Sequence, residues 1–520
     1  MSEVFEVPRR QRQLFLDDVG IARIENLKRT MHRPEKRGPV LIADRPADGE
    51  GLQSASAPMW VESEKQYNLV YEIRSNEGKR YALATSRDGI EWEKPSLGLV
   101  EFGGSTDNNI FPTPDDQRIW HVVHDPDDSD ETRRFKGFLT VKKGRIPVVS
   151  PDCVNWRKLD VDPLALRSGD AGTLTYDRPR RRFLGLLKRP GKIPNPQAVG
   201  RAYDVSISED FESWNDPVFI FGMDTGRDQE MALDVIRRRL ADQGFANPMY
   251  VDPDPELGWT PPEGKNHIAT WRAECYNFGV FPYEGIYLGL ATIYYPTGQG
   301  LPERVNTDGF NTIQLVASRD LKHWERLGDR QPFLETSRLD EGLVGNYDRL
   351  QLGFFNQGLV HGDEVRFYYN GMKRRVCFHD RYTDGTPRDP STLSDAERMD
   401  WLEDGDSAIL LAALRRDGFV SLDAGDQGGV VETEPFELHG SEILVNADLG
   451  EGELDAEMLS DDGEVLAVSQ PTSGDQLQGV LRWQEGQISK HRGEQVSLRF
   501  NLSNGSLYSY WLEDEDPPAR

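Results

Sequence analysis

Two carboxylates interrupt an aromatic, apolar stretch, residues 271–285, which reads WRAECYNFGVFPYEG. A buried carboxylate is costly unless it is paired, so these two acids are candidates for chemistry rather than for packing. Glu274 leads into a run with little polarity, whereas Glu284 lies in Phe-Pro-Tyr-Glu-Gly, a sequence typical of a turn between strands. We therefore expect Glu274 to be a catalytic residue and Glu284 to be at most a pocket residue.

Hydrolysis of a glycoside needs a second carboxylate, which acts as the nucleophile or activates water while the first protonates the leaving oxygen. Asp170 in SGDAGTLTY, Asp348 in NYDR and the pair Asp17-Asp18 in LFLDD also lie beside strand-like runs. A single Asp in such a place is more commonly a turn former. We expect Asp170 to supply a second carboxylate of the site and Asp18 or Asp348 to supply the third.

Side chains that could bind a sugar complete the predicted site. They are Trp60, Trp120, His124, Arg272, Tyr276, Tyr283, Glu284 and Asp348. His121 and His124 have a spacing that metal ligands use, but they lack a clear third ligand, so we predict no catalytic metal. No cofactor is required by this chemistry, although the many Asp residues leave a structural Ca²⁺ open.

The elements that must position these residues follow from a repeated turn pattern, S-x-D-x-x-x-W. Its four copies are SRDGIEW (86–92), SPDCVNW (150–156), SEDFESW (208–214) and SRDLKHW (318–324), and RRDGFVS (415–421) is an eroded fifth. Ser and Asp suit the turn because they bond local amides, and Trp packs at the start of the next strand. Each copy follows strand-like runs, so the repeat predicts blades of a β-propeller.

The repeat, together with the alternation of apolar and polar residues between turns, predicts an all-β protein. We expect an N-terminal arm over 1–50 that packs on the propeller, a five-bladed propeller with the site over 51–424, and an antiparallel β-sandwich over 425–515. An amphipathic pattern over 228–245, DQEMALDVIRRRLADQGF, predicts one helix inserted between blades.

The composition excludes several classes of function. The net charge of −27 makes nucleic acid and anionic membranes poor partners, since both need a basic surface. Arginine outnumbers lysine among the 61 basic residues, which fits a protein kept soluble at high salt or an ordinary acidic protein. Three distant cysteines argue against a disulfide scaffold, and with no apolar span or leader pattern we expect a cytoplasmic protein.

The sequence resembles the five-bladed glycoside hydrolases of families 32, 43 and 68, the invertase, levanase and arabinanase group. It is most similar to a family 32-like branch, through LFLDD, SRDGIEWEKPSLGLVEFGGSTDNNI, FPYEGIYLG and RDGFVSLDAG. The resemblance covers nearly the whole chain. It implies a propeller followed by a sandwich, a carbohydrate substrate and hydrolysis by carboxylates.

The resemblance also assigns roles to individual residues. In the fructan-hydrolysing relatives, a Glu in a Glu-Cys motif at the head of blade 4 is the acid/base, and Glu274-Cys275 matches it. Asp170 takes the place of the blade 3 Asp that stabilises the transition state, although Gly169 and Ala171 replace the flanking Arg and Pro. The blade 1 nucleophile motif, Trp-Met-Asn-Asp-Pro-Asn-Gly, is absent, which leaves the retaining mechanism and fructose specificity open.

These observations leave three hypotheses. The leading one is a glycoside hydrolase that acts on an oligosaccharide or a small glycoside. The second is a carbohydrate-binding propeller without hydrolysis, favoured by the missing blade 1 motif. The third is a sugar lyase, phosphorylase or transferase on the same scaffold, for which Arg272 and the arginines at 180–182 are the only suggested phosphate ligands.

Overall fold

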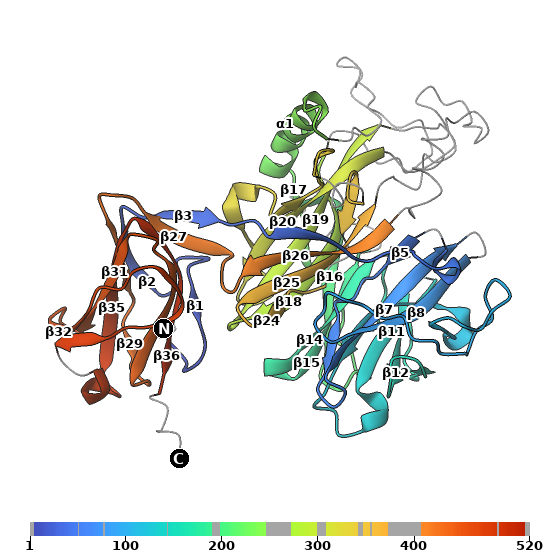
Figure 1. Ribbon diagram of the computed structural model, residues 1–520, viewed down its shortest axis with the longest axis horizontal. Helices are drawn as coiled ribbons and strands as arrows, with labels where there is room; N and C mark the ends of the chain where they lie inside the picture. The colour runs from blue at the N-terminus through green and yellow to red at the C-terminus, as the bar shows by residue number, and fades with distance from the viewer. Residues whose placement is uncertain are drawn as a thin grey trace.

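The computed structural model describes residues 5–49, 51–75, 78–142, 144–189, 198–245, 272–298, 308–341, 347–353, 356–372, 407–485 and 488–514. Within them nearly all of the regular secondary structure is β-strand, arranged in seven antiparallel sheets. Figure 1 shows two parts, a larger one that carries α1 and a smaller one that contains both ends of the described chain. The prediction of an all-β protein is confirmed.

Five sheets follow one another along the chain and form the larger part. The first contains β5 (Gly51–Gln53), β6 (Met59–Val61), β7 (Gln66–Ser75), β8 (Gly78–Ser86) and β9 (Ile110–Phe111). The second contains β10 (Arg118–His124), β11 (Phe135–Val141), β12 (Gly144–Ser150) and β13 (Arg157–Lys158). The third contains β14 (Gly172–Asp177), β15 (Arg182–Lys188), β16 (Ala198–Ser208) and β17 (Val218–Asp224). The fourth contains β18 (Glu274–Tyr283), β19 (Ile286–Gly298), β20 (Asp308–Ser318), β21 (Glu325–Arg326) and β22 (Leu334–Glu335). The fifth contains β23 (Gln351–Gly353), β24 (Leu359–His361), β25 (Glu364–Met372), β26 (Ser407–Arg415) and β4 (Glu35–Leu41).

Two further sheets form the smaller part. One contains β1 (Gln13–Leu14), β3 (Lys28–Met31), β27 (Val420–Ala424), β30 (Glu442–Asp448), β33 (Asp475–Val480) and β36 (Gly505–Glu513). The other contains β2 (Ile21–Glu25), β28 (Gly429–Thr433), β29 (Phe436–Glu437), β31 (Glu453–Ser460), β32 (Val465–Ser469), β34 (Trp483–Glu485) and β35 (Gln495–Ser503). Alternating apolar residues from both sheets, such as Val445, Phe500 and Leu512, meet in one buried cluster.

The N-terminal segment contributes to both parts, which differs from the expected arm on the propeller. Its first three strands pair with strands of the smaller part: β1 with β36, β2 with β28 and β3 with β27. Only β4 joins the larger part, where it pairs with β26. The smaller part also begins at β27, before residue 425. These pairings join residues nearly a whole chain apart, so no local pattern in the sequence reveals them.

The repeated turn forms as its residue types demand. In the first copy, the Asp88 carboxylate accepts from the amides of Ile90 and Glu91, and the indole of Trp92 donates to the carbonyl of Gly89. The other three copies repeat these bonds, with indole-to-carbonyl distances of 2.8, 3.3 and 3.2 Å. The residue after each Asp has a positive φ, including Phe211 at 66°. The network of side-chain bonds therefore holds a conformation that a bulky residue rarely adopts.

The eroded fifth copy has a different use. Asp417 is fully buried, and its carboxylate accepts from Arg12 Nη1 at 2.6 Å, the Tyr283 hydroxyl at 2.7 Å, Ser509 Oγ at 2.7 Å and Asn446 Nδ2 at 3.2 Å. These donors come from the N-terminal segment, β18, β36 and β30. Four elements from both parts thus meet on one carboxylate, which we call the joint.

The predicted helix is confirmed as α1 (Arg227–Ala241), which lies between the third and fourth sheets in the chain. Its buried face carries Ala232 and Ile236, which pack in the cluster formed by those two sheets. Among the described residues, no helix combines the length and the apolar character that a membrane-spanning helix needs.

Candidate active site

The first strands of the second, third and fourth sheets, β10, β14 and β18, lie side by side, and the segments that follow β5 and β23 reach the same centre. Val122 N donates to Ser56 Oγ at 2.7 Å, and Thr173 Oγ1 donates to the carbonyl of Phe278 at 2.9 Å. Asn356 bridges two neighbours, because its Oδ1 accepts from Ala57 N at 2.7 Å and its Nδ2 donates to the carbonyl of Leu174 at 3.2 Å. We call this level, marked by Ser56, Val122, Leu174 and Asn356, the waist.

Counting back along each strand from the waist gives one charged level. Arg118 and Asp170 each lie four residues before their waist residue, and Glu274 lies four before Phe278. Arg118 begins β10, Glu274 begins β18 and Asp170 lies two residues before β14, so all three lie on the same side of the waist. We call this end of the first strands the entrance. The sequence prediction that Asp170 and Glu274 begin neighbouring strands thus corresponds to one shared end of the assembly.

Glu274 is 2% exposed and is held by two guanidinium groups. Arg201 Nη1 donates to Oε2 at 2.6 Å, and Arg272 Nε lies 3.0 Å from Oε1. Arg201 reaches it from β16, where the register shifts between Val199 and Ala202. Such a bulge re-aims the side chains beside it. Both oxygens of Glu274 are therefore occupied by cations.

Gly200 allows this approach. Its φ is +73°, and a Cβ at this position would lie 2.9 Å from Glu274 Cγ. Any other residue would therefore combine backbone strain with a clash against the buried glutamate. The close contact between β16 and β18 at the entrance depends on this glycine.

Asp170 lies two residues before β14, and its side chain is largely exposed. Its Oδ1 accepts from Lys188 Nζ at 2.5 Å. Loss of surrounding water raises the pKa of Asp170, but the ammonium of Lys188, together with Arg201, outweighs that effect and brings the pKa below its ordinary value. Asp170 is therefore an accessible carboxylate that stays ionised at neutral pH.

Tyr276 joins the two carboxylates into one group. Lys188 Nζ lies 5.8 Å from the centre of its ring, and the Arg201 guanidinium carbon lies 5.2 Å from the same ring. The cations that hold Asp170 and Glu274 thus flank a single, partly exposed aromatic ring. An aromatic face beside two carboxylates is a suitable floor for a sugar ring.

Helix α1 fixes the backbone just before Glu274. The side-chain amide of Gln229 donates to the carbonyl of Ala273 at 3.0 Å and accepts from the amide of Ala273 at 3.1 Å. Ala273 is 1% exposed, so both of its backbone groups rely on this amide. Gln229 therefore positions the start of β18.

The structure does not bring Asp18 or Asp348 into this group. Asp18 is exposed on the N-terminal segment, where Oδ1 pairs with Arg29 at 2.5 Å. Asp348 is fully buried and pairs with Lys36 Nζ at 2.8 Å, which ties the closing strand β4 to the fifth sheet. The Tyr369 hydroxyl also donates to Asp348, at 3.0 Å. Both acids serve contacts within the protein, so neither is placed as the third carboxylate.

Tyr283 and Glu284 lie at the far end of β18, in or beside the joint. The Tyr283 hydroxyl donates to Asp417, and Glu284 Oε2 accepts from the backbone amide of Arg12 at 2.9 Å. Burial raises the pKa of Glu284, and nearby Asp417 adds to the rise. The structure therefore separates Glu284 from Glu274 by the length of a strand and does not place either Tyr283 or Glu284 at the entrance.

Trp60 and His124 lie on the other side of the waist. His124 ends β10 and its Nδ1 lies 3.0 Å from the carbonyl of Trp60. Trp60 is 38% exposed and packs against Tyr67 at 4.9 Å between ring centres. The backbone of Trp120 lies in β10, whereas its side chain is outside the described residues. Of the predicted binding residues, Arg272 and Tyr276 accompany Glu274.

No metal centre emerges from the part of the chain that the structure describes, because no three His, Cys, Asp or Glu side chains converge there. His121 is fully buried near the waist, and burial lowers its pKa well below the usual value, with Arg145 and Arg118 adding to that effect. Cys153 and Cys275 are free and buried, and Cys377 lies outside the described residues.

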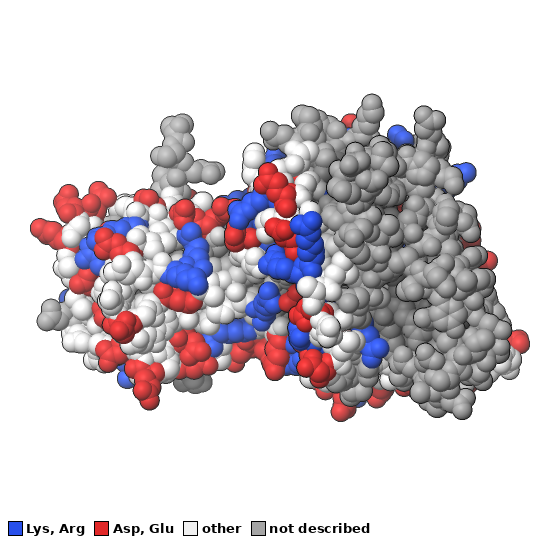
Figure 2. Space-filling view, turned by 90° about the horizontal axis from the view of Figure 1, so that it is seen from above, with Lys and Arg blue, Asp and Glu red and all other residues white. Residues whose placement is uncertain are grey.

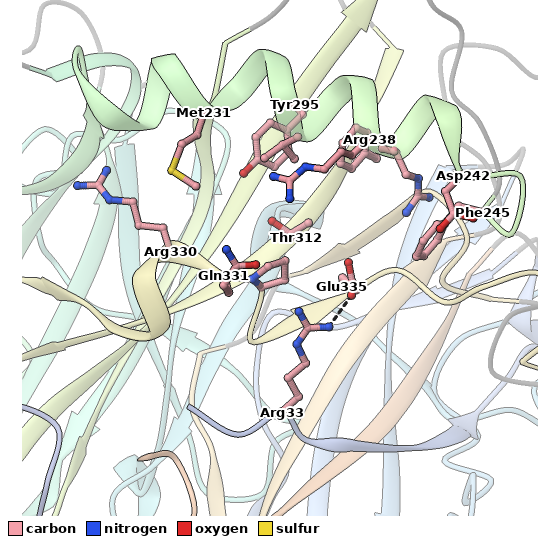
Figure 3. Close-up of a pocket in the computed structure, with 14 residues that line it drawn as sticks. Arg33, Met231, Arg238, Asp242, Phe245, Tyr295, Thr312, Arg330, Gln331 and Glu335 are labelled. Atoms are coloured by element: carbon pink, nitrogen blue, oxygen red, sulfur yellow. Dashed lines mark hydrogen bonds and ion pairs between the residues drawn. The ribbon is translucent and has the colours of Figure 1, made fainter. Parts of the chain in front are cut away.

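A separate cavity of about 190 Å³ lies beneath α1, as Figure 3 shows. Arg238 and Tyr295 reach into it from above, and Arg33 lies below, paired with Glu335 at 2.7 Å. Burial raises the pKa of Tyr295 to about 12. None of the predicted catalytic carboxylates lines this cavity.

Sequence reasoning missed the residues that support the two carboxylates. Lys188 and Arg201 contact the carboxylates themselves. Arg145 and Gln229 bind the backbone beside them. All four lie on the second or third strand of a sheet or on α1, and their partners are set by sheet register. The alternation in RAYDVSI predicts that Arg201 and Tyr203 share one face of a strand, but nothing local shows that this face meets Glu274.

Comparisons with known proteins give distant structural similarities alone. Searches with protein-family models and with curated protein sequences return no match. The structure is similar to glycoside hydrolases of families 32 and 43. A family 32 β-fructofuranosidase from Bombyx mori shares 10% identity at a TM-score of 0.36, covering 92% of this chain and 95% of that one. An exo-β-1,3-galactanase from Phanerochaete chrysosporium shares 11% identity at a TM-score of 0.36, with coverages of 88% and 95%. An N-acetylgalactosamine deacetylase from F. plautii shares 13% identity at a TM-score of 0.37, with coverages of 80% and 96%. Similarity at this level says nothing about substrate or catalytic residues.

Proposed function

We propose that this protein is a glycoside hydrolase with its active site at the entrance of a five-bladed β-propeller. In this interpretation each of the five sequential sheets is a blade, β4 closes the ring, and the two-sheet part is an accessory sandwich. The observation that carries the proposal is the pairing of Asp170 and Glu274 around Tyr276, at the starts of neighbouring first strands. Two carboxylates flanking an aromatic floor are what glycosidic cleavage requires.

The two carboxylates suit different roles. Asp170 is exposed and its pKa is lowered, so it can face the sugar as an anion, either as a base for water or as a group that stabilises the positively charged transition state. Glu274 is the proposed acid/base. Since Arg201 and Arg272 occupy both of its oxygens, a bound substrate must displace one of them before Glu274 can transfer a proton. The reaction needs no cofactor because the side chains supply both proton transfer and charge stabilisation.

A second function is a carbohydrate-binding propeller without hydrolysis. The specific observation that favours it is the doubly paired state of Glu274, which holds the glutamate away from free proton exchange. This candidate shares the entrance and the aromatic floor with the first. It predicts binding of a glycan without any cleaved product.

The test is hydrolysis of a panel of oligosaccharides and aryl glycosides at low and high salt. Wild type is compared with Glu274→Gln and Asp170→Asn, and released sugar is measured by chromatography. We expect cleavage by wild type and loss of at least about 100-fold in both variants. Cleavage that persists in both variants would remove the assignment of the site, and binding without product by wild type would select the second function.

A further inference from the structure

The entrance carries more positive than negative charge, although the whole chain has a net charge of −27. Three carboxylates lie there, each in contact with at least one cation. The set consists of Glu72, Asp170 and Glu274 with Lys79, Arg118, Arg145, Lys188, Arg201 and Arg272. Six cations against three carboxylates leave an excess of three positive charges among the described side chains.

The charged set is continuous from the first sheet to the fourth. Glu72 Oε2 lies 2.8 Å from Arg118 Nε and Glu72 Oε1 lies 2.6 Å from Lys79 Nζ. Arg145 then donates to the carbonyls of Gly169 and Ala171, at 2.9 and 3.0 Å, on either side of Asp170. The set continues through Lys188 and Tyr276 to Arg201 and Glu274. The excess positive charge therefore belongs to one continuous group of side chains at the entrance.

Arg145 is a cation of the entrance that forms no ion pair with a described carboxylate. Its side chain is fully buried, and its guanidinium donates to backbone carbonyls with no carboxylate partner among the described residues. Burial lowers the pKa of Arg145 to about 10, and the repulsion from Arg118 adds to the effect. The carboxylate of Asp170 attracts this buried cation without forming an ion pair with it, so Arg145 adds to the positive charge of the entrance.

Arg201 and Arg272 are the cations of this set that could bind an anionic ligand. Glu274 needs one cation to balance its charge but has two. Arg201 contacts it through Nη1 and Arg272 through Nε, which leaves the other guanidinium nitrogens of both residues without a described carboxylate. Their side chains are 17% and 31% exposed. Both side chains are therefore partly open to solvent at the entrance.

We propose that the natural glycan carries an anionic group, a carboxylate or a sulfate, and that Arg201 and Arg272 bind it at the entrance. Guanidinium groups bind such oxygens with paired, charge-assisted hydrogen bonds. This inference deepens the proposed function and rests on it for the role of Glu274. An anionic group that takes Arg272 would release Glu274 Oε1, so the correct substrate itself would free the acid/base for proton transfer.

The experiment measures equilibrium binding by calorimetry with matched pairs of oligosaccharides. Within each pair the ring and the linkage are the same and only C6 differs, as a hydroxymethyl group or as a carboxylate. A third arm carries sulfate esters on the neutral ring. The proteins are wild type, Arg201→Gln and the control Arg499→Gln, which changes an arginine in the smaller part that also contacts two carboxylates, Glu432 and Glu457.

We expect wild type to bind one acidic glycan at least about tenfold more tightly than its neutral counterpart at low salt. This preference should shrink as salt is raised, disappear in Arg201→Gln and stay intact in Arg499→Gln. A carboxylate preference or a sulfate preference identifies which anion is recognised. Equal binding of neutral and acidic members by wild type, or a preference that Arg201→Gln leaves unchanged, would overturn the inference.

The outcomes separate this inference from the proposed function. Tight binding of an acidic glycan with no cleavage would retain the inference and refute hydrolysis. Cleavage of neutral glycans with no acidic preference would retain hydrolysis and refute the inference.

Discussion

The joint at Asp417 and the entrance at Glu274 both centre on a buried carboxylate paired with arginine, yet they differ in what surrounds the pair. At the joint, four donors converge on Asp417, and Arg12 is 5% exposed and covered by Trp511 at 3.7 Å. At the entrance, two arginines share Glu274 and keep unused nitrogens near solvent.

The difference teaches how a structural ion pair can be told from a functional one. A carboxylate whose donors match its acceptors, in a site closed to water, holds elements together. A carboxylate that contacts more cations than it can neutralise, beside an exposed carboxylate such as Asp170, is typical of a site that binds a ligand. On the face seen in Figure 2, basic and acidic side chains of the described residues lie interspersed, as in ordinary surface ion pairs.

The largest expected effect comes from Glu274→Gln. We expect kcat/KM to fall by about 1000-fold, because the amide cannot exchange a proton, while the melting temperature changes little, since Arg201 and Arg272 can be hydrated. Steady-state kinetics and thermal unfolding of the same preparations check this. A large loss of stability with activity retained would reverse the comparison and make Glu274 the structural residue.

Asp417→Asn should give the opposite pattern. We expect the free energy of unfolding to fall by about 3–5 kcal/mol, because Arg12 is left buried without its counter-charge. The folded fraction should keep its kcat/KM, since the joint lies at the other end of β18 from the entrance. Urea unfolding followed by tryptophan fluorescence, with kinetics at low temperature, measures both quantities. A variant as stable as wild type would contradict the role of the joint.

A smaller effect is expected from Gln229→Leu, which sharpens the comparison by altering only the support of Glu274. The backbone groups of Ala273 lose their partners, so the start of β18 can shift, and kcat should fall about tenfold with KM nearly unchanged. Gln243→Leu, at an exposed residue just beyond α1, is the matched control. Equal effects of the two substitutions would show that Gln229 does not position the site.

The smallest effect concerns the repeated turns, which belong to neither region. Burial raises the pKa of Asp210, but hydrogen bonds from the amides of Ser213 and Glu212 outweigh it and lower the pKa to about 2. A pKa lowered by folding stabilises the protein above the unfolded value near 4, and that contribution is lost as the pH falls toward 2.

Asp210→Asn should therefore reduce stability by about 1 kcal/mol at neutral pH, after allowance for solvent screening of this exposed residue. The difference from wild type should vanish near pH 2. Unfolding measured between pH 2 and 7 follows it. A difference that stays constant with pH would show that the charge of Asp210 is not what stabilises the turn.

The sequence predicts those features that depend on local chemistry. The four S-x-D-x-x-x-W turns, the helix α1 and the place of Glu274 at a strand start all follow from residue types and spacing. The place of the N-terminal strands in the smaller part could not be predicted. β1 pairs with residues near 510, and a short alternating run does not show which strand it will pair with. The loss of Trp from the fifth repeat was a signal that Asp417 no longer forms the common turn.

The cations of the entrance were beyond prediction for a related reason. Lys188 and Arg201 are unremarkable in sequence, and only the register of β15 against β16 and the bulge near Arg201 place them beside the carboxylates. Asp18, Glu284 and Asp348 looked similar to Asp170 in sequence. Their partners, Arg29, Arg12 and Lys36, decide their place. Glu284 and Asp348 are 272 and 312 residues from Arg12 and Lys36, separations that no motif encodes, whereas Asp18 and Arg29 are only 11 residues apart.

A crystal structure of Glu274→Gln with an acidic oligosaccharide tests the central claim most directly. The account predicts density for a sugar over Tyr276, between Asp170 and residue 274, with its anionic group against Arg201 and Arg272. Sugar bound beside Trp60 and His124, or in the cavity beneath α1, with an empty entrance would contradict it.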